Sequence, residues 1–261
     1  MKTLIAVPCF DMVNESFSSS LLELIKPGET VYTSVKNTLI YQARNRIAAN
    51  AVKDGFDRVM WFDSDVVFPE TAMVQLMNDM NETGADIVSG LYFLRKPETK
   101  PVVFDNLVWD LNRETNIVQS GATYFEDYPE DSLFECAGIG FGCVLTTVDI
   151  LNRVGEKYST PFTPLVGLGE DLSFCWRAAQ IGAKILCDSR VKCGHIGQVV
   201  FDETWYKREI IKYHKPIVRC KDCKNYNTEN CADGFGWCNR NGTGHGSTDD
   251  WFCADGELKQ K

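Results

Sequence analysis

The sequence predicts an α/β domain over residues 1–215, followed by a small cysteine-rich module over residues 216–261. Short apolar runs alternate with segments of helical period through the first part, which is the pattern of strands that alternate with helices. The composition shifts at Pro216, and five of the eleven cysteines lie beyond that point. A chain of 261 residues that is 44% hydrophobic can bury one sizeable core and a small appendage.

Two periodicities predict the elements of the first domain. Continuous apolar runs, the first of which ends at Pro8, predict buried strands over residues 4–7, 58–62, 87–93 and 183–187. Apolar residues at helical spacing predict amphipathic helices over residues 39–52, 73–80, 170–179 and 203–213. We interpret the methionines of residues 73–80 as core side chains. Between Pro101 and Leu133, short alternating pieces predict hairpins inserted over an active face.

The charge balance excludes some classes of partner. The chain has 27 Lys and Arg against 36 Asp and Glu, for a net charge of −9. It therefore lacks the positive field that non-specific binding to nucleic acids or anionic membranes needs. No apolar run approaches the roughly 18 residues of a membrane span, and the segment after Met1 turns polar too soon for a secretory signal. We expect a cytoplasmic protein with no membrane partner.

Six cysteines sit singly in apolar stretches, where a free thiol behaves as a small buried hydrophobe. They are Cys9, Cys136, Cys143, Cys175, Cys187 and Cys193.

The first candidate site is the motif Asp63-Ser64-Asp65, directly after the predicted strand of residues 58–62. At a strand period of two, both carboxylates point to one side at the carboxyl end of a buried strand, where open α/β sheets bind ligands. Two acids there suit a hard divalent cation that also holds a diphosphate. The alternative is a pair of turn or capping acids, since Asp is common in turns.

Two further motifs follow. Glu170 and Asp171 open a predicted helix after a glycine-rich loop, and first-turn acids either act in catalysis or compensate the helix dipole. His195 lies between Gly194 and Gly197, just beyond a strand, where it is either functional or a structural side chain at the surface.

Taken together and in this order, these motifs resemble the GT-A glycosyltransferases, especially family-2-like enzymes and their phage-encoded relatives. The resemblance covers about residues 3 to 200. It is carried by the segments IAVPCF, LIYQARNRIAANAV, VMWFDSDVVFP, SGLYFLRKP, AGIGFGCVLTTVDIL, GEDLSFCWRA and DSRVKCGHIG. It implies a GT-A fold that binds a nucleoside diphosphate sugar, with a UDP-sugar favoured, through Mn²⁺ or Mg²⁺. For a phage-encoded member, the compartment would be the host cytoplasm.

The resemblance also implies roles on the donor side. Asp65 would bind the metal, and Asp63 would bind the metal as well or contact the ribose or the metal's water. His195 would be the third ligand from the protein. Ser64 would lie among the contacts to the nucleotide sugar. The segment Pro8, Cys9 and Phe10 matches the position where the family cradles the base. Arg44 and Asn45 match an Arg-Asn pair near the nucleotide, although a helical Arg is also commonly a surface charge.

On the acceptor side, Asp171 aligns with the acid that deprotonates the acceptor hydroxyl in inverting members, as general-base catalysis requires. Glu170 would bind the donor sugar or the acceptor. Retaining GT-A enzymes have similar acids, so retention stays open as the alternative. We favour inversion. The stretch Gly138 to Gly142 matches a segment that lines the sugar cavity, and tight strand packing is its equal alternative.

The cysteine-rich module predicts a structural zinc site. Cys220 and Cys223 form a CxxC pair, the usual first half of a tetrahedral thiolate site. The module resembles small cysteine-rich modules on phage and prophage proteins of Gram-positive bacteria, which implies Cys238 and Cys253 as the other ligands. Cys231 or His245 could substitute for one of them. So small a piece could hardly fold without such a staple.

The sequence therefore leaves three candidate functions. The first is a metal-dependent glycosyltransferase whose acceptor is a protein, a glycan or a modified base. The second is a catalytically degenerate nucleotide-sugar-binding scaffold whose zinc module mediates interactions. The third is a nucleic-acid binder, which the module disfavours because residues 216–261 contain six Lys and Arg against seven Asp and Glu. The intact acids and His195 favour the enzyme.

Overall fold

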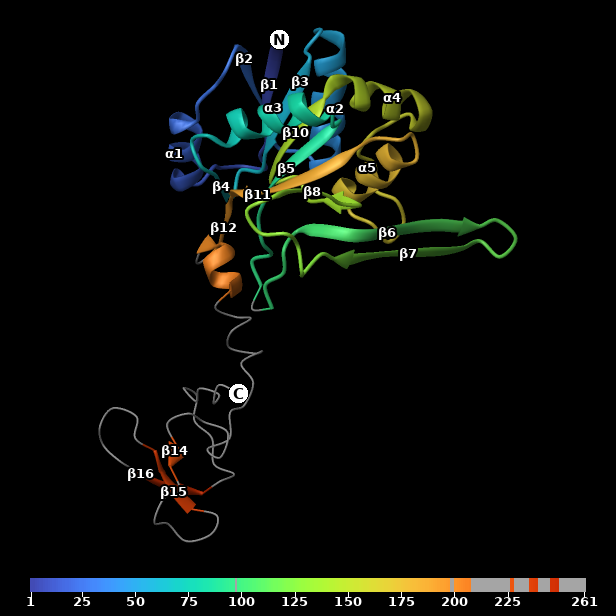
Figure 1. Cartoon of the computed structure of the whole chain (residues 1–261). Helices are drawn as coiled ribbons and strands as arrows, with labels where there is room; N and C mark the ends of the chain where they lie inside the picture. The colour runs from blue at the N-terminus through green and yellow to red at the C-terminus, as the bar shows by residue number, and fades with distance from the viewer. Residues whose placement is uncertain (97, 198–199, 208–225, 228–234, 239–244, 249–261) are drawn as a thin grey trace. The chain divides into compact units, whose positions relative to one another are not determined.

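The computed structural model describes residues 1–261 except 97, 198–199, 208–225, 228–234, 239–244 and 249–261 (Figure 1). Contacts divide the chain into two compact units, Met1–Glu209 and Ile210–Lys261. The predicted boundary after residue 215 lies outside the described residues. Among the described residues, no helix has the length and apolar character needed to cross a membrane.

A seven-stranded mixed sheet forms the centre of the first unit, in the order β2-β1-β3-β10-β5-β11-β8 (Figure 1). Strand β1 runs parallel to β2 and β3, and β5 runs parallel to β11. Strand β10 lies antiparallel between β3 and β5. The strands are β1 (Lys2–Pro8), β2 (Glu29–Val35), β3 (Arg58–Phe62), β5 (Ile87–Leu91), β8 (Leu133–Glu135), β10 (Cys143–Thr147) and β11 (Ile185–Lys192).

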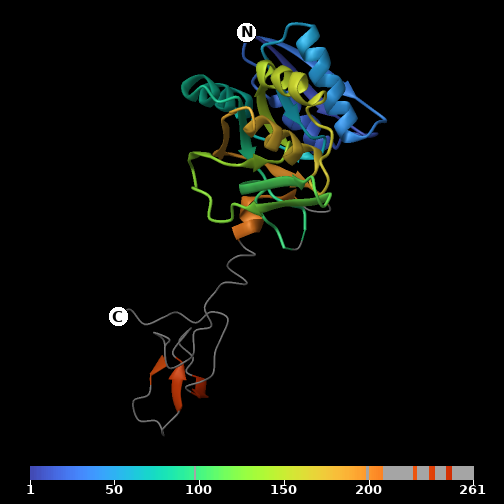
Figure 2. The same cartoon turned by 90° about the vertical axis from the view of Figure 1, so that its right-hand side faces the viewer.

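Helices cover both faces of this sheet because its strands are apolar on both sides (Figure 2). In β3, Trp61 packs into one core cluster and its neighbours Met60 and Phe62 pack into the other. The first cluster takes residues from α2 (Ile40–Lys53), α4 (Val148–Tyr158) and α5 (Glu170–Ala179). The second takes residues from α1 (Glu15–Glu23) and α3 (Ala72–Thr83). The mixed α/β fold class predicted from the sequence is confirmed.

Several elements match their predictions closely. Strand β3 and helix α5 have the predicted bounds, and the methionines of α3 are buried core residues. The six cysteines outside the module are free and buried, as predicted. Residues 203–207 are helical, and the rest of the helix predicted over 203–213 lies outside the described residues.

The sequence analysis missed α1, β2 and α4. Helix α1 is rich in serine, and β2 is a half-exposed edge strand without an apolar run. Helix α4 begins directly after β10, so the apolar residues of both elements merge into one stretch of sequence. Local pattern is weakest where an element is exposed or where two elements abut.

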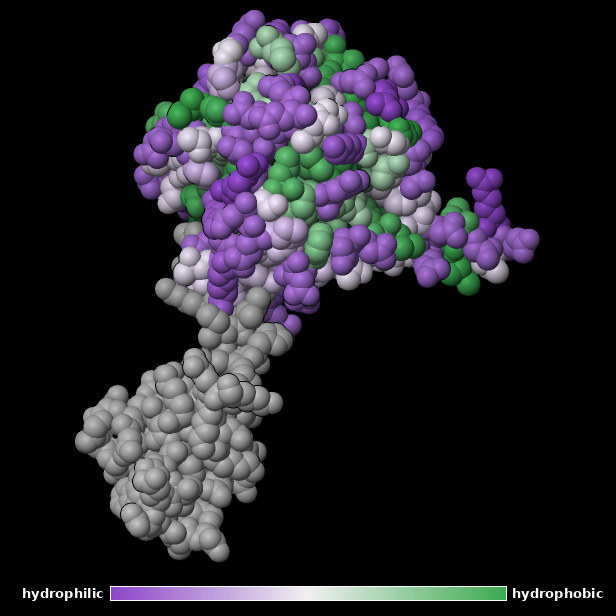
Figure 3. Space-filling view, viewed as in Figure 1, coloured by the Kyte–Doolittle hydropathy of each residue, from purple (hydrophilic) through white to green (hydrophobic). Residues whose placement is uncertain are grey.

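The predicted hairpin is formed by β6 (Val103–Asn112) and β7 (Ile117–Tyr124), and β6 also pairs with β9 (Gly138–Ile139) on its other side. It projects well beyond the central sheet (Figure 1). Apolar side chains are exposed along it, as the space-filling view shows (Figure 3), and they include Val108, Leu111 and Ile117. Part-way along β6, the ring of Trp109 packs edge-on against Trp176 of α5, with 5.2 Å between the ring centroids. The hairpin therefore forms a wall beside the helix that carries Glu170 and Asp171.

A second small sheet, in the order β13-β12-β4, joins β4 (Val66–Val67), β12 (Gly194–Ile196) and β13 (Val200–Phe201). Its register pairs His195 with Val66, the residue directly after the Asp63-Ser64-Asp65 motif. This pairing brings the third predicted motif to the first.

The second unit contains an antiparallel sheet of β14 (Tyr226–Asn227), β15 (Phe235–Cys238) and β16 (His245–Thr248). Cys238 ends β15 and His245 begins β16, and the two residues are register partners. The other predicted zinc residues lie outside the described residues; they are Cys220, Cys223, Cys231 and Cys253.

Candidate functional site

The predicted donor-side residues gather at one edge of the main sheet. Because β1 and β3 are parallel, their carboxyl ends lie at the same edge. Pro8, Cys9 and Phe10 follow from β1, and Asp63 and Asp65 follow β3. This is the edge of an open α/β sheet at which ligands usually bind.

A buried guanidinium organises the site. Arg44 of α2 is 2% exposed, and its Nη2 donates to Oδ1 of Asp63 at 2.7 Å. Its Nε lies 3.5 Å from Oε1 of Glu170, the first residue of α5. The guanidinium also lies 5.1 Å from the ring centroid of Phe141. Arg44 is therefore no surface charge, because it bridges the end of β3 to the start of α5.

The two acids of the motif point to different partners. The amide of Val66 donates to the carbonyl of Asp63 at 3.2 Å, so residues 63–66 form a turn. Strand period two therefore does not apply to the motif, although the charge of Asp65 still acts on Asp63. Asp63 faces Arg44, whereas Asp65 faces His195 and Arg95. The cause is the small sheet: β4 pairs with β12 from Val66 onward, and the chain must turn to reach it.

The environments of the two acids differ in the same way. Burial raises the pKa of Asp63, and the charge of Arg44 opposes this without reversing it. For Asp65, burial acts to raise the pKa, but the hydrogen bond and charge of His195 and the charge of Arg95 outweigh it. The pKa of Asp65 is therefore below its usual value. Asp65 is therefore the motif acid that stays ionised, and Arg95 is its ion-pair partner.

A backbone carbonyl orients the ring of His195. Its Nδ1 lies 2.9 Å from the carbonyl oxygen of Phe93, which can only accept a hydrogen bond. Nδ1 therefore donates this hydrogen bond, which leaves Nε2 as the ring atom that faces the site. That atom lies 3.5 Å from Oδ2 of Asp65. A backbone carbonyl that fixes the tautomer in this way is the usual support of a metal-binding histidine.

The residues present fit a divalent cation bound by one carboxylate and one imidazole, with phosphate and water oxygens to complete its shell. Of the three predicted ligands, Asp65 and His195 converge and Asp63 is engaged by Arg44. Across the described parts of the chain, no group of three or more His, Cys, Asp or Glu side chains is placed to hold a metal ion by itself.

Asp171 has the electrostatics of a base. It lies in the first turn of α5, where its Oδ1 accepts a hydrogen bond from the amide of Leu172 at 2.8 Å. Burial, followed by the negative charge of Glu170, raises the pKa of Asp171 to about 6. A carboxyl with this pKa is ionised near neutral pH and remains basic enough to accept a proton.

The glycine-rich stretch packs against an aromatic ring. A Cβ on Gly142 would lie 3.0 Å from Cζ of Tyr92, and one on Gly140 would collide with its hydroxyl. Gly142 also accepts a hydrogen bond from the amide of Asp63 through its carbonyl at 3.1 Å. Of the two alternatives for Gly138 to Gly142, close packing is what the structure shows at these two positions.

A small pocket lies where the resemblance places the base. It has a volume of about 180 Å³. Phe10, which is 76% exposed, stands at this pocket, whereas Cys9 is buried. Its lining is mostly apolar and comprises Pro8, Cys9, Phe10, Val35, Thr38, Leu39, Ile40 and Ala43.

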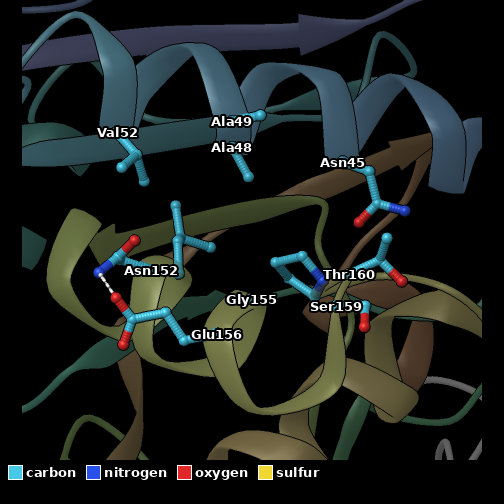
Figure 4. A pocket seen from close by; sticks show the side chains of 11 residues that line it. Asn45, Ala48, Ala49, Val52, Asn152, Gly155, Glu156, Ser159 and Thr160 are labelled. Carbon is cyan, nitrogen blue, oxygen red and sulfur yellow. Dashed lines mark hydrogen bonds between the residues drawn. The ribbon is translucent and has the colours of Figure 1, made fainter.

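Asn45 is placed elsewhere. Its Oδ1 accepts a hydrogen bond from the amide of Phe162 at 2.8 Å, and its Nδ2 lies 3.4 Å from Oγ1 of Thr163. It lines a different pocket of about 420 Å³ between α2 and α4, next to Thr160 (Figure 4). The side chain faces away from Arg44 because consecutive residues of a helix point in different directions. Asn45 therefore anchors the segment that leads into α5, and its predicted contact with the nucleotide stays a prediction.

Three residues of one segment contribute to the site without having been predicted. Tyr92 packs its ring against His195, Phe93 supplies the carbonyl for Nδ1, and Arg95 contacts Asp65 at 2.6 Å. All three belong to the segment SGLYFLRKP, which carries part of the resemblance. The available signal was a basic residue directly beyond a buried strand. Ser64 is partly buried in the turn between the two acids.

Comparisons with known proteins support the fold. The structure is similar to that of A197 from STIV, with a TM-score of 0.53 and 21% identity over 76% of this chain and 86% of that chain. It is also similar to GalNAc-T7, solved with UDP, GalNAc and Mn²⁺, with a TM-score of 0.51 and 10% identity. That match covers 80% of this chain and 47% of GalNAc-T7, about half its length. The fold is GT-A-like. No family model and no curated protein matches the sequence.

The raised pKa of Asp171 predicts a pH-dependent cost to stability. A carboxyl with a pKa of about 6 in the folded protein and 3.8 otherwise loses stability as pH rises between these values. Asp171→Asn should therefore raise the free energy of unfolding at pH 7 by roughly 1–3 kcal/mol. The difference should vanish near pH 4, as measured by urea denaturation. Asp149→Asn, at an exposed site on α4, should change it by less than about 0.5 kcal/mol at either pH. If the Asp171→Asn variant is less stable than the wild type at pH 7, the raised pKa of Asp171 is contradicted.

Proposed function

We propose that this protein is a metal-dependent glycosyltransferase that moves a sugar from a nucleoside diphosphate sugar, with a UDP-sugar favoured, to an acceptor hydroxyl. The observation that carries the proposal is the bridge from Asp63 through Arg44 to Glu170. It joins the cation side of the site, at Asp65 and His195, to the helix that presents Asp171. A GT-A-like fold with this juxtaposition supports transfer of a sugar at one edge of the sheet.

The donor would lie between these two sides. The pocket at Pro8 and Phe10 would take the base, and Asp65 with His195 would hold the divalent cation. When bound, Mn²⁺ or Mg²⁺ would neutralise charge on the diphosphate leaving group. Asp63 is fixed by Arg44 and would accept a hydrogen bond from the ribose. The neighbouring carboxylates disfavour the diphosphate unless a cation offsets them.

Asp171 would act as the base for the acceptor. In the transfer step, its carboxylate accepts the proton of the acceptor hydroxyl, and the acceptor oxygen bonds to the anomeric carbon. The bond from that carbon to the phosphate oxygen breaks, and the diphosphate departs with the electron pair. Attack from the face opposite the leaving group inverts the anomeric centre. Glu170, held near Arg44, would contact the sugar or the acceptor.

The first test of this proposal concerns the donor. Nucleoside diphosphate binding should require a divalent ion, and Asp65→Ala should abolish detectable binding, because the carboxylate contributes both a ligand and the charge that holds the cation. Calorimetry with UDP and GDP, with Mn²⁺ or with chelator, measures this directly. Glu126→Ala, an exposed carboxylate that pairs with Lys100, is the control and should bind as the wild type does. Undiminished affinity in Asp65→Ala with chelator present would refute the cation site.

The second test separates chemistry from binding. Asp171→Asn should leave donor affinity nearly unchanged while transfer falls by about a hundredfold or more, because a base acts in the transition state. In the wild type, kcat should rise with pH through about 6 as Asp171 ionises, and this step should be lost in the variant. If donor affinity and kcat fall together, Asp171 binds the donor. Cation-dependent nucleotide binding without any turnover would favour the scaffold alternative, and NMR of the product linkage distinguishes inversion from retention.

We propose that the cysteine-rich module holds one structural zinc ion through Cys220, Cys223, Cys238 and Cys253. Four thiolates and the small size of the module support this proposal. Purified protein should contain about one zinc per chain. Cys220→Ser or Cys253→Ser should lose it, because a tetrahedral site that lacks one thiolate has much lower affinity. Cys231→Ser is the matched control and should retain zinc. Metal analysis without zinc, together with disulfide-bonded cysteines by mass spectrometry, would overturn the site.

A further inference from the structure

Arg95 occupies the point at which Asp65 and His195 converge. Its Nη1 lies 2.6 Å from Oδ2 of Asp65, the same oxygen that lies 3.5 Å from Nε2 of His195. The same Nη1 donates to the carbonyl of Ile196 at 3.1 Å. A fixed positive charge thus lies where the proposed cation would need the same carboxylate oxygen.

Hydrogen bonds hold the backbone of the loop that carries Arg95, although the side chain of Arg95 is not buried. The amide of Leu94 donates to the carbonyl of Lys100 at 2.9 Å. The buried hydroxyl of Thr99 lies within 3.1 Å of the carbonyl oxygens of both Leu94 and Lys96. The side chain of Arg95 itself is 50% exposed. The backbone of this loop is therefore held in place, while the guanidinium of Arg95 borders solvent and can change its rotamer.

A guanidinium and a divalent cation at Oδ2 of Asp65 would compete for the same carboxylate charge, because the two positive charges repel each other at this distance. A half-exposed ion pair contributes little stability, so a doubly charged ion can displace it. Once displaced, a planar guanidinium tethered beside the site has the donor geometry that suits phosphate oxygens.

We propose that Arg95 is a positioning residue that holds Asp65 before a cation binds, and that it releases Asp65 to a divalent cation and then binds the diphosphate of the donor. This inference rests on the proposed function, because it assumes the cation at Asp65 and His195. Arg95 would thereby couple the two binding events. Bound nucleotide would stabilise the displaced side chain of Arg95 and so raise the affinity for the cation.

The test uses the full chain and measures two affinities. Mn²⁺ binding without nucleotide, followed by electron paramagnetic resonance, should be about fivefold tighter in Arg95→Ala, because the competing ion pair is removed. UDP and GDP binding at saturating Mn²⁺, followed by calorimetry, should be roughly tenfold weaker or more for the nucleotide that the wild type binds. Arg95→Lys should recover part of the nucleotide affinity.

Lys100→Ala is the matched control, since Lys100 belongs to the same loop and forms an ion pair of 2.8 Å with Glu126 away from Asp65. It should leave both affinities unchanged. If Arg95→Ala binds Mn²⁺ no more tightly than the wild type, or binds nucleotide equally well, the inference is wrong while the cation site stands. If the wild type binds no Mn²⁺ even with nucleotide, the proposed function fails as well. Near-ultraviolet circular dichroism confirms that each variant is folded.

Discussion

The candidate site depends on the buried guanidinium of Arg44. It reaches from α2 to Asp63 at the end of β3 and to Glu170 at the start of α5, so it joins elements that are far apart in the chain. Without it, two partly buried carboxylates would face each other with no opposite charge between them. Removing one partner of such a group commonly costs about 3–5 kcal/mol, because an uncompensated charge stays behind. The same bridge leaves a net negative site, which is the electrostatic reason that a cation and a diphosphate would enter together.

The antiparallel strand β10 places the other components around this bridge. It lies between β3 and β5, and the glycine-rich segment directly before it brings Gly142 against the ring of Tyr92. Burial, together with the charges of Asp63 and Asp171, raises the pKa of Tyr92 well above its ordinary value. The ring is thus neutral and close-packed, and it lies within reach of the charges of Asp63 and Asp171. A side chain at Gly140 or Gly142 would have to displace it.

The segment after β5 shows how a few consecutive residues can shape several parts of a site. Tyr92 supports the ring of His195, the carbonyl of Phe93 fixes its tautomer, and Arg95 contacts Asp65. The aromatic stack of Phe93 on Tyr206, with centroids 4.7 Å apart, ties the same segment to the helical residues 203–207. The end of β5 therefore links the cation side of the site to the last described helix of the first unit.

The sequence by itself determined the α/β class, the bounds of β3 and α5, the buried methionines and the set of candidate acids, because these follow from local periodicity and residue type. Only the tertiary structure decided that Asp63 and Asp65 diverge, that Asn45 turns to Phe162, and that Arg95 reaches Asp65. Strand period two failed at the motif because pairing between β4 and β12, more than a hundred residues apart, forces a turn there. The direction of a side chain at the end of a strand depends on which distant segment pairs next to it, and local sequence carries no record of that pairing.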